Sequence, residues 1–245
     1  MAKITVLGLG PGHAGLITRD SWAIMERAEQ LILRTKIHPT VAALDEAGIT
    51  YTTYDGYYEE AADFETLYRS IAEDLLKKAE ELGELVYVVP GSPLVAERTV
   101  VLLRDMAEGT PVEVDIRPGM SFVEVMYTRL GIDPVEGLTI LDALDIETLN
   151  ETPAQSLIIT QVYSQPIASD AKLMLMDLYP DEYEITYIHN LAMEDESIRQ
   201  IPLYELDRQP DLDHLTSLYI RPLTAKKRLK QAKFAALSGF FAENP

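Results

Sequence analysis

The chain has 245 residues, of which 47% are hydrophobic and 25% are charged, and its formal net charge is −19. This length allows one large domain or two small ones, and the acidic charge counts against a long nucleic acid as partner, because its phosphates would be repelled. Cysteine is absent, which excludes disulfides and thiolate metal sites and fits a reducing compartment.

Targeting signals are not apparent in the sequence. Lys3 is followed by a strand-like run rather than by the apolar region and cleavage site of a secretory leader. No apolar run approaches the roughly 20 residues that cross a bilayer. We therefore expect a cytoplasmic protein without membrane contact. The basic cluster within 226–233 is expected to be the solvated face of a terminal helix rather than a polyanion site.

Apolar runs alternate with helical patterns along the whole chain. Strands are predicted at 3–8, 30–34, 49–54, 85–90, 112–117, 138–142, 156–163, 184–190 and 216–222. Helices are predicted near 17–28, 38–47, 60–83, 95–109, 121–131 and 166–179. This alternation favours an α/β fold, and the unbroken apolar run at 85–89 is typical of a buried parallel strand.

The regular alternation of predicted strands and helices changes near residues 117–119, after which prolines become frequent in the loops. We therefore predict an N-terminal α/β subdomain over 1–117 and a C-terminal α/β subdomain over 118–223. Residues 224–245 are expected to form a helix or linker that leads into a further domain.

The clearest motif is a glycine-rich turn between the first strand and a helix that begins near Thr18. Gly10, Gly12 and Gly15 have the G-x-G-x-x-G spacing of a dinucleotide site. Such a turn lets a ligand approach bare backbone, because glycine lacks a Cβ atom. A tight turn without any ligand is the alternative at this point.

Two features disfavour a nicotinamide or flavin site. The dinucleotide pattern expects a carboxylate at the end of the second strand, where this chain has Arg34 and Thr35. Pro11 lies inside the turn and lacks the N–H that could bind pyrophosphate.

Three further turns follow predicted strands, at 90–93, 117–121 and 189–191. Ligands of open α/β sheets bind at the carboxyl ends of the strands, so these turns can converge on one crevice. Each turn alone is a weak signal, and their order along the chain is more specific.

In this order the turns resemble those of the tetrapyrrole (corrin/porphyrin) methylase family, over about residues 3–223. The family's G-x-G-P-G turn is matched by residues 8–12, with a Leu-Ile-Thr sequence at 16–18. Its usual Gly-Asp-Pro turn is Gly91-Ser92-Pro93 here, and its Pro-Gly-x-Ser turn is at 118–121. The segments 187–191 and 201–206 are similar to the branch in which a methylase-like half is fused to a MazG-type nucleotide pyrophosphohydrolase.

The resemblance implies two α/β subdomains with a ligand cleft between them, usually in a homodimer, and S-adenosylmethionine as methyl donor. Carried over position by position, it implies donor contacts from Gly10, Pro11, Gly12, Gly91, Ser92, Pro93, Val95, Ser121 and Phe122, and more loosely from Gln161, Leu191, Thr216 and Ser217. No catalytic residue and no metal ligand is assigned, because displacement at an activated methyl carbon needs alignment more than a strong acid or base.

The expected activity is methyl transfer to a small planar substrate. Ser92 stands where the family commonly has Asp, which removes a negative charge. A non-catalytic ligand-binding or regulatory domain of a pyrophosphohydrolase fusion is therefore the alternative. An RNA ribose methyltransferase is a third possibility, which the net charge disfavours.

Other conspicuous residues are given structural roles. No metal-ligand spacing links His13, His38, His189 and His214. We expect an acidic loop at Glu194-Asp195-Glu196 rather than a metal cluster. A packed loop, rather than a pocket for a flat ligand, is expected at Tyr51, Tyr54, Tyr57 and Tyr58, and core packing at Trp22, Met25 and Ala28.

Overall fold

A computed structural model describes residues 2–60, 63–149 and 151–223. Within these residues the chain divides into two compact units, the first holding 2–132 with 191–195 and the second 133–190 with 196–223. The units part after Ile132, later than the predicted boundary at 117, because the turn at 117–121 stays packed on the first unit: a Cβ on Gly119 would lie 3.0 Å from Cδ of Pro93.

The first unit is built on a parallel sheet. Its strands are β1 (Ala2–Gly8), β2 (Leu31–Leu33), β3 (Thr52–Thr53), β4 (Glu84–Val89) and β5 (Val112–Ile116), in the order β3-β2-β4-β1-β5. The carboxyl ends of β4, β1 and β5 are therefore neighbours at one edge of the sheet.

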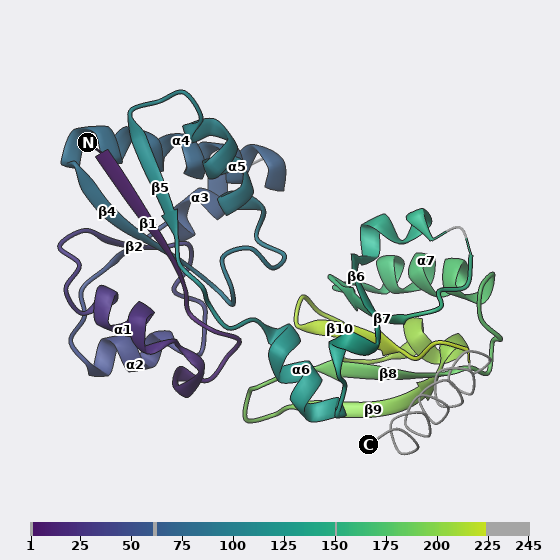
Figure 1. Ribbon diagram of the computed structural model, residues 1–245. Coiled ribbons are helices and arrows are strands. Elements are labelled where there is room, and N and C mark those ends of the chain that lie inside the picture. The colour runs from purple at the N-terminus through teal and green to yellow at the C-terminus, as the bar shows by residue number, and fades with distance from the viewer. Residues whose placement is uncertain (1, 61–62, 150, 224–245) are drawn as a thin grey trace, which may run out of the picture. The chain divides into compact units, whose positions relative to one another are not determined.

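Helices cover both faces of this sheet (Figure 1). α1 (Arg19–Met25) and α2 (Val41–Glu46) share a buried cluster with Leu7, Leu33 and Val88 of the strands. On the opposite face lie α3 (Asp55–Glu60), α4 (Phe64–Leu82) and α5 (Arg98–Ala107). α6 (Phe122–Leu130) follows β5 and lies near α2, with which it lines a common cavity. Alternate residues of β1 point to the two faces, so Ile4 and Val6 pack against α4 and α5.

The predicted helix over 60–83 is confirmed as α4 within the described residues. Its apolar positions Leu67, Ile71 and Leu75 are buried against the sheet. Asp63 caps its first turn by accepting a hydrogen bond from the Thr66 amide at 2.8 Å. Gly83 ends the helix with φ +90°, a conformation that favours glycine.

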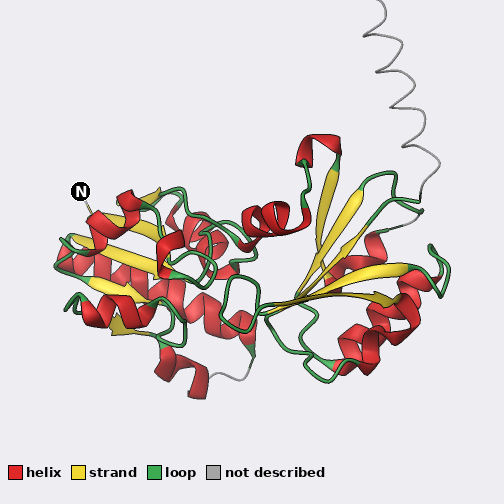
Figure 2. Ribbon diagram, turned by 90° about the horizontal axis from the view of Figure 1, so that it is seen from below, coloured by secondary structure: helices red, strands yellow, loops and turns green. Residues whose placement is uncertain are grey.

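The second unit is a mixed sheet with helices against it (Figure 2). Its strands are β6 (Leu138–Asp142), β7 (Ser156–Thr160), β8 (Glu184–His189), β9 (Ser197–Pro202) and β10 (Thr216–Ile220), in the order β6-β7-β10-β8-β9. The β6–β7 pair is parallel and the other pairs are antiparallel. α7 (Gln165–Met176) and the 3₁₀ turns at Ala143–Thr148 and Leu203–Arg208 cover one face.

Several sequence predictions need correction. The strand expected at 49–54 is only Thr52–Thr53, and the strand expected at 156–163 ends at Thr160. β9 was not predicted, because Arg199 and Gln200 interrupt its apolar pattern, which an edge strand tolerates. The tyrosines expected in a loop at 57 and 58 lie in helix α3. The helix expected over 224–241 lies outside the described residues.

Candidate functional site

The first and second glycine-rich turns are joined to each other through their backbones. The Gly10 amide donates to the Gly91 carbonyl at 3.1 Å, and the Gly91 amide donates to the Gly10 carbonyl at 3.1 Å. Both residues have positive φ, +72° and +66°, which glycine adopts without steric cost. The pairing therefore extends the contact of β1 and β4 beyond the strands and fixes the two turns side by side.

The third turn packs on the first two through bare α-carbons. A Cβ added to Gly8 would lie 2.2 Å from the carbonyl oxygen of Gly91, and a Cβ on Gly119 would lie 3.5 Å from Cα of Gly8. The Arg117 amide also donates to the Val6 carbonyl at 2.9 Å. The predicted convergence is thus seen for the turns at 8–12, 90–93 and 117–121, whereas that of the turn at 189–191 stays a prediction.

The second turn continues into a loop that mixes buried and exposed residues. Pro93 is buried, whereas Leu94 is 54% exposed. The Val95 amide donates to the Ser92 carbonyl at 3.3 Å. Ala96 has φ +54°, a conformation that costs a non-glycine residue about 1 kcal/mol or more. Such local strain is often found near ligand sites.

A buried ion pair anchors the far end of this loop. Arg34, at the end of β2, contacts Glu97 with Nη1–Oε2 at 3.1 Å, and the Glu97 side chain is only 3% exposed. Glu97 also caps α5 by accepting from the Thr99 amide at 3.3 Å. Burial acts to lower the pKa of Arg34, but the combined effect of Glu97 and of three neighbouring tyrosines raises it. The position that a dinucleotide site would fill with a carboxylate is therefore a partly buried cation, paired with a buried carboxylate.

Ser121 is the N-cap residue of α6 and forms a capping box with Glu124. Its hydroxyl accepts from the Val123 amide at 3.1 Å and donates to the Glu124 carboxylate, which also accepts from the Ser121 amide at 2.8 Å. The Pro-Gly-x-Ser motif thus has a structural reason for its serine.

The first unit also contains a cavity of about 780 Å³ beside the first turn. Its walls come from that turn, from α2 and α6, and from the segment 192–194. Gly12 has φ +120°, and a Cβ there would lie 3.2 Å from Cγ of Met193. Three lining residues, Gly12, Met120 and Ala192, are chain neighbours of the predicted donor positions Pro11, Ser121 and Leu191.

In the second unit, the predicted positions Gln161, Thr216 and Ser217 share one sheet edge. Gln161 follows β7, while Thr216 and Ser217 begin β10, which runs antiparallel to β7. Thr216 pairs with His189 at the end of β8. Gln161 has φ +61°, again unusual for a residue other than glycine. Leu191 is buried and belongs to the first unit, so its grouping with these residues in one cleft stays a prediction.

The same edge of the second unit carries a charged network that sequence reasoning missed. Arg199 lies over the Tyr187 ring at 4.2 Å and contacts Asp211 through two hydrogen bonds of 2.9 and 2.5 Å. The Arg199 hydrogen bond holds the pKa of Asp211 below its usual range. His189 Nε2 lies 3.1 Å from Asp213. Only the pairing of β8 with β9 brings Arg199 here, and β9 was itself not predicted.

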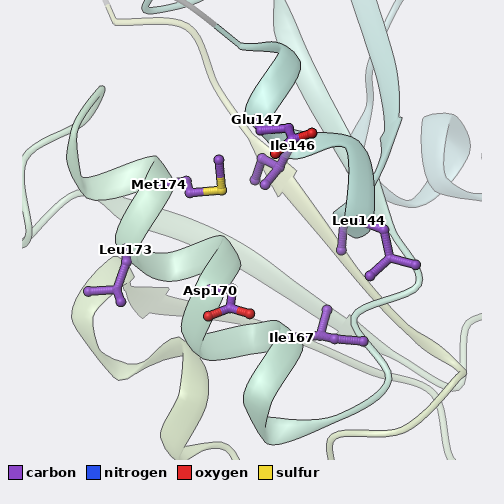
Figure 3. A pocket seen from close by; sticks show the side chains of 8 residues that line it. Leu144, Ile146, Glu147, Ile167, Asp170, Leu173 and Met174 are labelled. Atoms are coloured by element: carbon purple, nitrogen blue, oxygen red, sulfur yellow. The ribbon is translucent and has the colours of Figure 1, made fainter.

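A smaller hollow of about 350 Å³ lies between α7 and the 3₁₀ turn at Ala143–Thr148 (Figure 3). Leu144 and Leu173, at 61% and 59% exposed, contribute much of its apolar lining, with Glu147 and Asp170 beside them. None of the predicted site residues lines it.

Most of the residues for which the sequence predicts a structural role have that role in the structure. The expected hydrogen-bonding role of His13 is confirmed, because its Nδ1 accepts from the Gly15 amide at 3.0 Å, although His13 also lines the 780 Å³ cavity. Tyr54 is buried and donates to Asp74 at 2.7 Å. Met25 is in the core, and Trp22 is partly buried against it.

No helix in 2–60, 63–149 or 151–223 is both long enough and apolar enough to span a bilayer. Over the same ranges, no group of three or more His, Asp or Glu side chains is arranged as a metal site.

Solved structures with the same fold include several methyltransferases. A uroporphyrin-III-C-methyltransferase from Thermus thermophilus is 19% identical with a TM-score of 0.67, covering 90% of this chain and 94% of that one. A precorrin-6Y methylase from Archaeoglobus fulgidus is 20% identical with a TM-score of 0.65, covering 91% and 99%. A diphthine synthase, 14% identical with a TM-score of 0.65, covers 90% of both chains. At these identities the likeness concerns the fold alone.

Sequence comparison gives a nearer relationship. The chain is 40% identical over 227 residues to the uncharacterized protein YabN of Bacillus subtilis (strain 168), covering 93% of this chain. It spans only 46% of the length of YabN. The family profile of the tetrapyrrole (corrin/porphyrin) methylases matches residues 3–207. On these grounds the chain belongs to the tetrapyrrole (corrin/porphyrin) methylase family.

Proposed function

We propose that this chain is an S-adenosylmethionine-dependent methyltransferase that acts on a small acceptor. The observation that carries the proposal is the interlocking of three glycine-rich turns at the adjacent carboxyl ends of β4, β1 and β5. This is the edge at which open α/β sheets bind nucleotide-like ligands.

The residues at this edge fit the donor. Gly10, Gly12 and Gly91 have positive φ and no Cβ atom, so a ligand can lie close to the backbone of the turns. The partly exposed Leu94 and Val95 offer apolar surface for an adenine ring. The loop carrying Ser92 is held at both ends, by Gly10 at one and by Arg34 at the other.

S-adenosylmethionine supplies an activated methyl carbon: the acceptor's lone pair forms the new bond, the carbon–sulfur bond breaks, and S-adenosylhomocysteine leaves. The task left to the protein is alignment of donor and acceptor. Turns that are fixed by backbone hydrogen bonds suit that task, because a misplacement of the reacting groups by about 1 Å can reduce the rate a hundredfold. A proton carried by the nucleophile would pass to solvent or to a side chain such as His13.

Isothermal titration with S-adenosylmethionine and S-adenosylhomocysteine tests donor binding. We expect both to bind. Gly91→Val, at a positive φ in the second turn, should abolish binding, while Gly109→Val, at a similar φ in the loop before β5, should not. An absence of heat at protein concentrations near a millimolar would overturn the proposal. Transfer of a labelled methyl group to a metabolite extract then tests turnover.

A second candidate is a donor-sensing domain without turnover. Two observations favour it: Ser92 replaces the family's usual Asp, and the chain spans 46% of the length of YabN. The remainder of a longer chain, implied by the resemblance to be a MazG-type pyrophosphohydrolase, would then be the regulated partner. Donor binding without methyl transfer, together with a donor-dependent pyrophosphohydrolase rate in the longer protein, would support this candidate over the first.

We further propose the homodimer that the family resemblance implies and the cytoplasmic location expected from the sequence. Light scattering during size-exclusion chromatography tests the dimer, and fractionation of cells tests the location. RNA as acceptor remains disfavoured by the net charge of −19.

A further inference from the structure

The cavity of about 780 Å³ in the first unit has an uneven charge. Three carboxylates line its rim at exposed positions, from Glu46 on α2, Glu124 on α6 and Glu194 in the segment after Leu191, against the guanidinium of Arg129. A recess lined mainly by one sign of charge concentrates ligands of the opposite sign and repels those of the same sign. The net charge of −19 adds to this bias.

The rest of the lining is apolar and adaptable. Leu16, Pro39 and Val125 contribute aliphatic surface, and Met120 and Met193 contribute thioethers. Methionine side chains fit irregular shapes and make favourable contacts with the edges of aromatic rings. The volume lies within the usual range of small-molecule sites, about 300–1,000 Å³.

The cavity also borders the proposed donor site. Gly12, Met120 and Ala192 line it and directly follow or precede Pro11, Ser121 and Leu191 in the chain. Ala192 has φ +68°, so the backbone at this wall is held in a conformation that non-glycine residues rarely adopt. A ligand in the cavity would therefore lie next to the turns assigned to the donor.

We propose that this cavity is the acceptor site and that it selects a cationic acceptor with an aromatic or heteroaromatic body, not a polycarboxylate. That the ligand of this cavity is a methyl acceptor rests on the proposed function. The charge selectivity of the cavity can be measured without turnover. A tetrapyrrole whose side chains carry several carboxylates would meet Glu46 and Glu194 at close range and be repelled.

Two indole compounds of similar size and opposite charge probe the selectivity. Tryptamine carries an ammonium group and indole-3-acetate a carboxylate, and both are titrated into the full chain at low ionic strength. We expect tryptamine to bind about tenfold more tightly than indole-3-acetate, and uroporphyrin III not to bind measurably. Equal or tighter binding of indole-3-acetate or uroporphyrin III would overturn the proposal.

Paired variants locate the selectivity. Glu46→Gln/Glu194→Gln removes two lining carboxylates, while Glu73→Gln/Glu80→Gln removes two exposed ones from α4 with the same change in net charge. Glu124 is left in place because it caps α6. We expect the first pair to weaken tryptamine binding about fivefold and the second to leave it unchanged. An equal loss in both would show a bulk charge effect and overturn the site.

S-adenosylhomocysteine is titrated into the same proteins as a separate measurement. If it fails to bind while the tryptamine pattern holds, the proposed function fails and the selectivity of the cavity stands. If it binds while the tryptamine pattern is absent, the donor site stands and the cationic acceptor is overturned.

Discussion

Gly8 lies so close to Gly91 that a single methyl group at Gly8 would come within 2.2 Å of the Gly91 carbonyl oxygen. The neighbour is backbone, which cannot rotate away as the end of a side chain can. The end of β1 therefore has no room for any side chain, and the spacing of the first two turns depends on that bare α-carbon.

Gly8→Ala is expected to separate these turns. Overpacking of this kind costs about 1–3 kcal/mol of stability, and we expect the affinity for S-adenosylhomocysteine to fall at least about tenfold. Urea denaturation and titration calorimetry measure the two effects. Gly56→Ala in α3, where nothing lies within 4 Å, is the control and should be neutral or slightly stabilising. Normal donor binding by Gly8→Ala would contradict this account of the turns.

Ser92→Asp restores the carboxylate common in the family. A carboxylate beside the donor should favour S-adenosylmethionine, which has a sulfonium charge, over S-adenosylhomocysteine, which has none. We expect the ratio of the two affinities to rise about threefold to tenfold. Ala96→Asp adds the same charge at an exposed position of the same loop and should change the ratio less. If the two variants behave alike, Ser92 does not lie beside the sulfonium.

The ion pair of Arg34 and Glu97 should be strongly non-additive. Arg34→Met leaves a buried carboxylate unpaired and is expected to cost about 3–5 kcal/mol. Glu97→Gln leaves the guanidinium without its counter-charge but keeps an acceptor for the Thr99 amide. A double variant should lose much less stability than the sum of the single losses. Additive losses in a denaturation cycle would show that the two side chains are not coupled.

His38 predicts a loss of stability in mild acid. Burial, with a contribution from the nearby Arg34, lowers the pKa of His38 to about 4. The unfolded chain therefore takes up a proton near pH 6.5 that the folded chain refuses. Stability is lost as the pH falls from about 6.5 to about 4, by up to roughly 3 kcal/mol from this residue alone.

His38→Gln should reduce that pH dependence. The Thr40 amide donates to Nδ1 of His38 at 3.4 Å, which requires the unprotonated nitrogen that a glutamine oxygen can replace. Urea denaturation at pH 7 and pH 5 compares the variant with the wild type, and NMR titration follows the imidazole directly. An imidazole that titrates at its ordinary pKa would contradict the burial argument.

The local elements could largely be predicted from the sequence because each depends on nearby residues. The spacing of Leu67, Ile71 and Leu75 is sufficient for α4, and Gly83 marks its end. The first three turns were predicted at one edge because parallel strands place their carboxyl ends together. That argument requires no knowledge of side-chain contacts.

The contacts that could not be predicted join residues far apart in the sequence. Arg34 meets Glu97 only because β2 pairs with β4, and Arg199 meets Asp211 only after β9 joins the sheet edge. Ser121 and Gly12 were predicted only as donor contacts, without their packing partners in the protein. The Ser-x-x-Glu spacing of Ser121 and Glu124 is a signature that could have predicted the capping box, whereas no local pattern indicates that Gly12 packs on Met193.

The two roles of Glu124 limit the substitutions that this position can accept. Its carboxylate holds the Ser121 turn and also lines the neighbouring cavity. A substitution at Glu124 that altered ligand preference would release the amide and hydroxyl of Ser121 at the same time. Within the part of the chain that the structure describes, the side chains of Glu46 and Glu194 form no such hydrogen bond. Relatives with new acceptors should therefore vary at those two positions while keeping the carboxylate that begins α6.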